Sequence, residues 1–114
     1  MKFLSIWMPD PATPSGPPDA AHIEIMGRLV GEMMSEGVLL ETGGVEDGHA
    51  SLRVTRREGA TTVLDGPFAE SKELIGGYAL LRVNSKEEAV AVAERFMAFA
   101  GNGTCELHEV SEWD

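Results

Sequence analysis

The sequence predicts an α+β fold in which two helices cover one face of an antiparallel sheet. Two stretches, residues 19–37 and the segment after Ser85, repeat apolar residues with the spacing of an amphipathic helix. Between and around them lie short apolar or alternating runs bounded by glycine and proline, which are typical of strands. The order is strand, helix, strands with a hairpin, strand, helix, strand. This order fits a ferredoxin-like sandwich, with residues 1–114 forming one domain.

The first predicted strand, residues 2–8, carries apolar side chains on both of its faces. Alternation groups them into two sets, Leu4, Ile6 and Met8 on one side and Phe3, Ser5 and Trp7 on the other. The segment from Pro9 to Pro18 follows and holds five of the six prolines. Proline at this density predicts a surface loop and no regular structure.

The first predicted helix begins at Asp19 and ends at Gly37. The Asp19 side chain can accept hydrogen bonds from free amides of the first turn, and glycine can adopt the left-handed conformation that closes a helix. One half of this helix is apolar and should pack on the sheet: His22, Ile23, Ile25, Met26, Leu29, Val30, Met33 and Met34.

His22 lies inside this apolar arc, so its imidazole should point toward the sheet from the first turn. The positive end of the helix dipole favours the neutral imidazole there, which is the form that can act as a base. A histidine at the edge of the core that bonds to the backbone is the alternative interpretation.

Shorter strands are predicted at residues 38–41, 51–57, 61–64, 78–83 and 104–110. Residues 58–60 form a short reversal, which makes a hairpin of the strands on either side. Ser85 and Glu88 have the spacing of a capping box, in which each side chain satisfies the backbone amide of the other. Gly101 then ends the second helix, whose apolar side holds Ala89, Val92, Ala93, Phe96, Met97 and Ala100.

Charge restricts the class of partner. Nine Lys and Arg residues stand against nineteen Asp and Glu, a formal net charge of −10. This charge repels phosphate backbones and anionic lipids, so the sequence predicts neither a nucleic-acid nor a membrane partner. A basic protein partner stays open, although solubility alone accounts for an acidic surface. No secretory stretch or membrane-length apolar run occurs, and we expect a cytoplasmic protein.

Several common chemistries have no motif in the chain. There is no glycine-rich phosphate loop, nucleophile elbow or zinc-ligand spacing, so the sequence predicts no metal and no tightly bound cofactor. Cys105 is the single cysteine and shares a strand face with Leu107. We expect a small core residue at this position and not a reactive thiol.

The segment at residues 65–77 is the candidate site. It joins two predicted strands, begins with an Asp-Gly-Pro corner, ends with Gly76 and Gly77, and carries Asp65, Glu70, Lys72 and Glu73. Loops held by a rigid scaffold commonly carry binding groups. A plain structural turn is one alternative. Another is that Lys72 only pairs with Glu70 and Glu73 in a solvated ion network.

The string at residues 65–78, Asp-Gly-Pro-Phe-Ala-Glu-Ser-Lys-Glu-Leu-Ile-Gly-Gly-Tyr, resembles the signature of the YCII-related family, and in particular its DGPF-domain branch. The resemblance extends over nearly the whole chain. It implies a bacterial protein that forms a two-fold dimer with its sheets face to face, a dimeric α/β barrel. It also implies a histidine and aspartate pair at a pocket: His22 matches the histidine in position, and Asp65 is the best candidate for the aspartate.

The predicted sheet also favours a homodimer, because two helices cover only one of its faces. We expect Phe3, Trp7, Tyr78 and Leu80 on the other face, where a second copy would shield them from water. A cleft between subunits would then bring together the catalytic candidates His22 and Asp65. The residues expected to bind substrate there are Trp7, Lys72, Glu73, Tyr78 and Arg82.

Two functions follow from these residues. In the first, a cofactor-independent enzyme uses His22 to move a proton, Asp65 to orient the imidazole, and Lys72 or Arg82 to hold an anionic group of a small substrate. In the second, the protein is a non-catalytic accessory or regulatory module that binds a small ligand or a protein. The DGPF branch is often associated with extracytoplasmic-function sigma factors, and the resemblance makes such a factor the expected protein partner.

Overall fold

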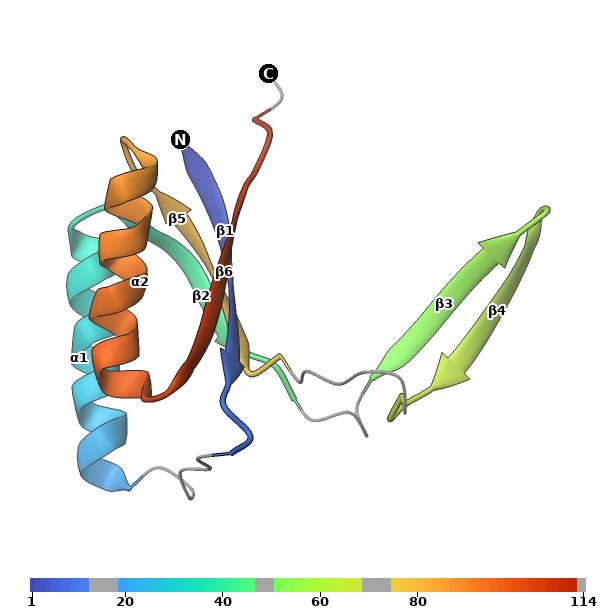
Figure 1. Ribbon diagram of the computed structural model, residues 1–114, viewed down its shortest axis with the longest axis horizontal. Coiled ribbons are helices and arrows are strands. Elements are labelled where there is room, and N and C mark those ends of the chain that lie inside the picture. The colour runs from blue at the N-terminus through green and yellow to red at the C-terminus, as the bar shows by residue number, and fades with distance from the viewer. Residues whose placement is uncertain (13–18, 47–50, 69–74, 113–114) are drawn as a thin grey trace.

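A computed structural model describes residues 1–12, 19–46, 51–68 and 75–112. Figure 1 shows two helices side by side against one face of a sheet, and a hairpin that projects away from this body. The elements are β1 (Lys2–Pro9), α1 (Ala20–Ser35), β2 (Leu39–Gly44), β3 (Leu52–Arg57), β4 (Ala60–Asp65), β5 (Gly77–Arg82), α2 (Lys86–Ala100) and β6 (Gly103–Glu109).

The main sheet has four antiparallel strands in the order β2-β5-β1-β6. With α1 after the first strand and α2 before the last, this order matches the predicted α+β ferredoxin-like sandwich. The strand bounds differ from the prediction by a residue or a few at each end, and Pro9, which was assigned to the loop, ends β1. The hairpin of β3 and β4 is an insertion that forms a two-stranded sheet of its own.

The predicted helix ends are confirmed. The Asp19 carboxylate accepts a hydrogen bond from the His22 backbone N–H at 2.7 Å, and Gly37 adopts a left-handed φ of 81° after α1. At α2, Ser85 Oγ accepts a bond from the Glu88 N–H at 3.1 Å. The Glu88 carboxylate accepts from Asn84 N–H, also at 3.1 Å, so the capping box is shifted by one residue on its return bond.

One prediction of strand orientation is wrong. Phe3 and Trp7 face the helices and not the uncovered side of the sheet. Phe3 is 5 % exposed within the core, and the Trp7 ring meets Phe96 of α2 edge-on with 5.4 Å between ring centroids. Both faces of β1 are apolar, so alternation alone does not distinguish the inner face. The buried core consists of Phe3, Leu29, Met33, Leu39, Leu81, Val83, Ala89 and Val92.

The buried face of α1 is narrower than its apolar arc. Leu29 and Met33 are buried, whereas Ile23 is 58 % exposed and Ile25 and Met34 are also exposed. A helix that packs on a sheet beside a second helix buries only a narrow stripe, and residues toward the sides of a wide arc remain in solvent.

The face of the sheet opposite the helices carries half-buried apolar side chains. Strand pairing sets Leu4 opposite Leu80 and Ile6 opposite Tyr78, and places Met8 on the same side. We call these five residues the open sheet face. Here Tyr78 and Leu80 lie as predicted, and Leu4, Ile6 and Met8 take the places that Phe3 and Trp7 were expected to occupy.

Candidate functional site

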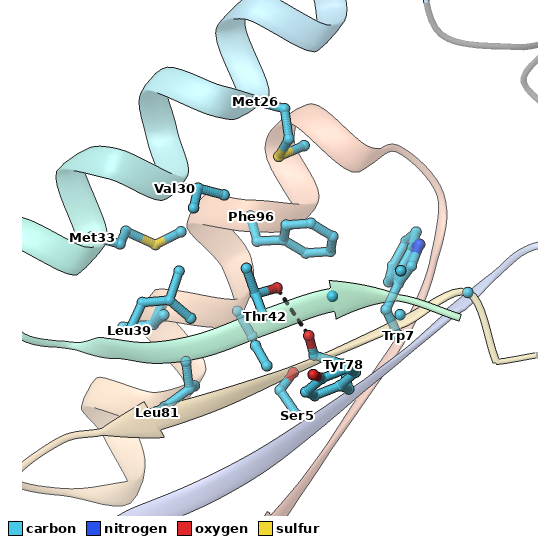
Figure 2. A pocket seen from close by; sticks show the side chains of 17 residues that line it. Ser5, Trp7, Met26, Val30, Met33, Leu39, Thr42, Tyr78, Leu81 and Phe96 are labelled. Carbon is cyan, nitrogen blue, oxygen red and sulfur yellow. Dashed lines mark hydrogen bonds between the residues drawn. The ribbon is translucent and has the colours of Figure 1, made fainter. Parts of the chain in front are cut away.

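A cavity of about 300 Å³ lies between the main sheet and the two helices. Figure 2 shows side chains of α1 and α2 pointing down toward the strands that form its floor. Its walls are mostly aliphatic and aromatic, with a few hydroxyl groups. The lining residues that carry the argument below are Trp7, Met26, Val30, Thr42, Tyr78 and Phe96.

Glycines leave the room that Trp7 needs at one end of this cavity. A Cβ atom on Gly76 would lie 3.1 Å from Trp7 Cδ1 and 2.9 Å from Pro9 Cδ. On Gly103 it would lie 2.5 Å from both the Trp7 ring and the Met8 carbonyl oxygen. Real Cβ atoms essentially never approach a neighbour closer than 3.0 Å, so the contacts at 2.5 and 2.9 Å could not form unless something shifted. The glycines therefore allow β1, β5 and β6 to hold the indole at the cavity wall.

The Thr42 and Ser5 hydroxyls at the cavity already have hydrogen-bond partners. Thr42 Oγ1 donates to the Tyr78 carbonyl oxygen at 2.9 Å (Figure 2). The buried Ser5 hydroxyl bonds to the Cys105 side chain. Burial raises the pKa of the Cys105 thiol, which favours its protonated form, and the side chain is partly buried without belonging to the core. An apolar wall with a few placed hydroxyls is typical of small-molecule sites.

His22 lies close to this cavity along α1 but does not line it. Its side chain is half-buried in the first helical turn, four residues before Met26, which does line the cavity. Residues four apart share a helix face. The imidazole therefore lies on the cavity side of α1, one turn toward the N-terminus.

Asp65 is placed elsewhere in the molecule. It is exposed at the end of β4, opposite Leu52 in the hairpin. Figure 1 shows α1 at one end of the molecule and the hairpin at the other. Within a single chain the structure does not bring His22 and Asp65 together, because the insertion leaves the sheet at this point of the sequence.

The remaining candidates are divided. Trp7 and Tyr78 both border the cavity, although pairing with Ile6 places the Tyr78 ring on the open sheet face, over Gly43. Arg82 does not line the cavity. Its guanidinium donates to Glu112 Oε1 at 2.6 Å and lowers the pKa of that carboxyl. Lys72 and Glu73 lie outside the described residues, as do Glu70, His49 and residues 13–18.

Sequence reasoning missed Met26, Val30 and Phe96 as site residues because core residues and cavity walls have the same apolar character. The signal that could have found the site is a pair of double glycines, residues 43–44 at the end of β2 and residues 76–77 at the start of β5, where Gly44 pairs with Gly77. Glycine in a strand often marks a place where a ligand or another backbone approaches closely.

Two further properties concern the described residues only. Among them, no three His, Cys, Asp or Glu side chains lie close enough to hold a metal ion. Neither of the two described helices has the length and apolar character needed to cross a membrane.

The molecule is thus an α+β protein with a ferredoxin-like strand order and an apolar cavity between its two layers. A sequence model of the YCII-related domain matches residues 1–114, and the chain belongs to the YCII-related family. No curated protein matches the chain.

Proposed function

We propose that the protein binds a small, largely apolar molecule in the cavity between the main sheet and the helices. The observation that carries this proposal is the cavity itself, about 300 Å³ in volume and lined by Trp7, Met26, Val30 and Phe96. This volume lies at the lower end of the range for small-molecule sites. Because the hydroxyl of Thr42 is already bonded, most of the binding free energy would come from apolar contact.

The chemistry that fits this site is acid–base catalysis by His22 on a group that extends from the cavity toward the helix N-terminus. His22 shares the helix face of Met26, which supports this role. Asp65 of the same chain lies too far round the molecule to orient the imidazole. A pair of His22 and Asp65 would therefore have to form between two chains. The proposed reaction uses no cofactor.

The polar end of such a ligand would lie outside the cavity. Arg82, which was expected to hold an anionic group, is engaged by Glu112. Lys72, in the segment between β4 and β5, stays the candidate for an anionic group, and Glu73 stays a candidate for a hydrogen-bond donor of the ligand. In this proposal, the negative charge of an anionic substrate lies on the group that stays outside the cavity.

Binding can be tested with phenylnaphthylamine, a neutral apolar dye whose fluorescence rises in apolar sites. We expect saturable binding to the wild type and at least about tenfold weaker binding to Val30→Phe, which fills the cavity, a loss of about 1.4 kcal/mol. Ile25→Phe is the matched control, because Ile25 lies on the exposed side of the same helix. Equal affinity of both variants would show that the dye, and by inference a ligand, binds elsewhere.

The proton-transfer step is tested separately, by screening small apolar esters, lactones and enolisable ketones for turnover. His22→Gln should abolish turnover and leave dye affinity within about twofold, since His22 does not line the cavity. Turnover that survives this substitution would eliminate the histidine mechanism and leave the binding proposal intact.

The second candidate is a binding module without catalysis. It is favoured by the absence of a titratable group among the described cavity walls apart from the Tyr78 phenol, whose ring lies on the other face of the sheet. Because the sequence resembles the DGPF branch, we propose that such a module associates with an extracytoplasmic-function sigma factor, and its charge of −10 suits a basic partner. Co-purification with such a factor that depends on the bound ligand would support this alternative.

Both candidates include a homodimer. The open sheet face, formed by Leu4, Ile6, Met8, Tyr78 and Leu80, would be costly to leave in water, and a second copy of the chain can cover it. Sedimentation at several protein concentrations checks this proposal, and a monomer at millimolar concentration would refute it.

A further inference from the structure

The hairpin of β3 and β4 has no support from its own chain in the described structure. The two strands pair with each other and with no other described strand. The radius of gyration is 16.2 Å, against about 13 Å for a compact domain of this length, because the hairpin projects from the body (Figure 1). A two-stranded hairpin alone in water is marginally stable. It needs a surface to pack on.

The two faces of the hairpin differ. Leu52, Val54 and Val63 lie on one face and are 65 %, 64 % and 61 % exposed. The other face is partly covered at its base, where the Arg53 guanidinium lies 4.0 Å from the centre of the Phe68 ring. The other face exposes one large aliphatic side chain, Leu64, at 56 %, so the larger exposed aliphatic surface is the one that Leu52, Val54 and Val63 form. We call Leu52, Val54 and Val63 the arm face.

The distribution of charge indicates which molecule packs on the arm face. Residues 52–65 carry three arginines and two carboxylates, a net charge of +1, and the rest of the chain carries six basic and seventeen acidic residues, a net charge of −11. Arg56 projects on the same side as the arm face, because it lies two residues beyond Val54, and Asp65 lies on that side as the partner of Leu52, whereas Arg53 and Arg57 lie on the other face. The arm is thus complementary in charge to the body of another copy of this chain.

The open sheet face offers a matching surface. Its apolar centre is flanked by carboxylates on the two edge strands, with Glu41 opposite Leu80 on β2 and Glu106 opposite Ile6 on β6, and the paired cations Lys2 and Arg82 lie at one end of it. We propose that the hairpin is an exchanged arm, which packs its arm face on the open sheet face of a second copy and receives the arm of that copy in return. Such reciprocal contact is what two-fold symmetry requires. The inference rests on the homodimer proposed above and adds the contact that forms it.

Val63→Lys and Thr62→Lys provide a matched pair of variants, because the two neighbours point to opposite faces of β4. Sedimentation equilibrium should show at least a tenfold higher dimer dissociation constant for Val63→Lys and a change of less than about threefold for Thr62→Lys. Val54→Thr, which keeps the shape and strand preference, should weaken the dimer in the same direction. A rise of the wild-type dissociation constant with added salt should accompany these effects.

Ile6→Lys, on the receiving face, separates the arm from the homodimer itself. Dissociation by both Ile6→Lys and Val63→Lys, with unchanged far-ultraviolet circular dichroism, supports arm exchange. Dissociation by Ile6→Lys alone overturns the arm and leaves a sheet-to-sheet dimer, and a wild type that is monomeric overturns both. Dye binding tests the cavity independently of the dimer contact. Because Val63 is remote from the cavity, the dye affinity of Val63→Lys should equal that of the wild type.

Discussion

At the scale of single residues, the cavity depends on positions where a side chain is missing. Trp7 closes one end of the cavity only because Gly76 and Gly103 leave space beside its ring. The indole is in turn held by its edge-on contact with Phe96 of α2. A glycine just before β5, a glycine in β6 and an aromatic residue on α2 therefore shape the same wall.

Gly103→Ala should destabilise the protein by about 1–3 kcal/mol. The added Cβ would lie 2.5 Å from the Met8 carbonyl oxygen, which belongs to the backbone and cannot turn away as a side chain would. Urea unfolding followed by Trp fluorescence measures the change. Gly31→Ala is the control: no atom lies within 4 Å of its Cβ position in α1, and alanine there should add about 0.5–1 kcal/mol. Equal effects of the two substitutions would show that the contact is relieved by strand movement.

The structural roles of some residues could be predicted from the sequence because those roles depend only on near neighbours in the chain. Asp19 caps α1 and Gly37 closes it because the hydrogen bond and the left-handed φ involve only near neighbours. The cavity was not readable, because Met26 and Phe96 come together from two helices far apart in the chain. Asp65 was chosen as the partner of His22 because it begins the Asp-Gly-Pro-Phe motif. A sequence motif does not show in which direction an inserted hairpin leaves the sheet.

At the scale of elements, the two helices are joined on their outer side by an ion pair. Arg95 of α2 donates from Nη1 to Glu36 Oε1 at 2.5 Å and from Nη2 to Glu32 Oε2 at 3.3 Å. Glu36 is the C-terminal cap of α1, so this contact ties the end of one helix to the middle of the other. The hydrogen bond from Arg95 holds the pKa of the Glu36 carboxyl below its ordinary value.

This ion pair predicts a pH-dependent contribution to stability. Because the pKa of Glu36 is lower in the folded than in the unfolded state, the contribution is present above the unfolded value of about 4.3 and is lost as the pH falls through the folded value. Arg95→Met keeps the aliphatic stem and removes the charge. Its melting temperature should lie below that of the wild type at pH 7, and the difference should shrink below about pH 4.

Arg28→Met is the control for this experiment, because Arg28 pairs with Glu24 within α1 alone. Its effect should be smaller at pH 7, since the pair is exposed and spans a single turn. A melting-temperature difference for Arg95→Met that is constant from pH 7 to pH 3 would contradict the assigned role of Glu36.

Element order was predictable because helices and strands differ in period, and a four-strand sheet with two helices has few arrangements. The inner face of β1 was not predictable, since Phe3 and Trp7 compete with Leu4, Ile6 and Met8 for the same core. The turn between β3 and β4 was predictable from Glu58 and Gly59, which adopt φ of 49° and 82°. That this hairpin leaves the main sheet depends on the whole fold.

At the scale of the whole molecule, one chain has a compact sandwich and an arm that shares none of its core. None of the buried core residues belongs to β3 or β4, so the body does not need the arm to stay folded. The arm, in contrast, has pairing within the hairpin but little burial. The arm and the core should therefore respond differently to a partner. If the arm is an interaction element, contact with a partner surface should change the stability of the arm and leave the stability of the core unchanged.

Hydrogen exchange monitored by mass spectrometry tests this division. In the wild type at a concentration where the dimer forms, amides of β3 and β4 should be protected, because the partner buries the arm face. In Val63→Lys, which is expected to be monomeric, they should exchange at least about tenfold faster, as local opening of a lone hairpin costs little free energy. Amides of β1 and β5 at the centre of the main sheet should exchange at similar rates in both proteins.

Thr62→Lys controls for the introduced charge and should keep the protection of the wild type. Rapid exchange of β3 and β4 in the wild type at every concentration would mean that the arm has no partner surface. Slow exchange in the monomeric Val63→Lys protein would mean that the hairpin is stable by itself, through the cross-strand pairs between Arg53 and Leu64 and between Thr55 and Thr62. Either result would remove the physical reason for exchanging the arm.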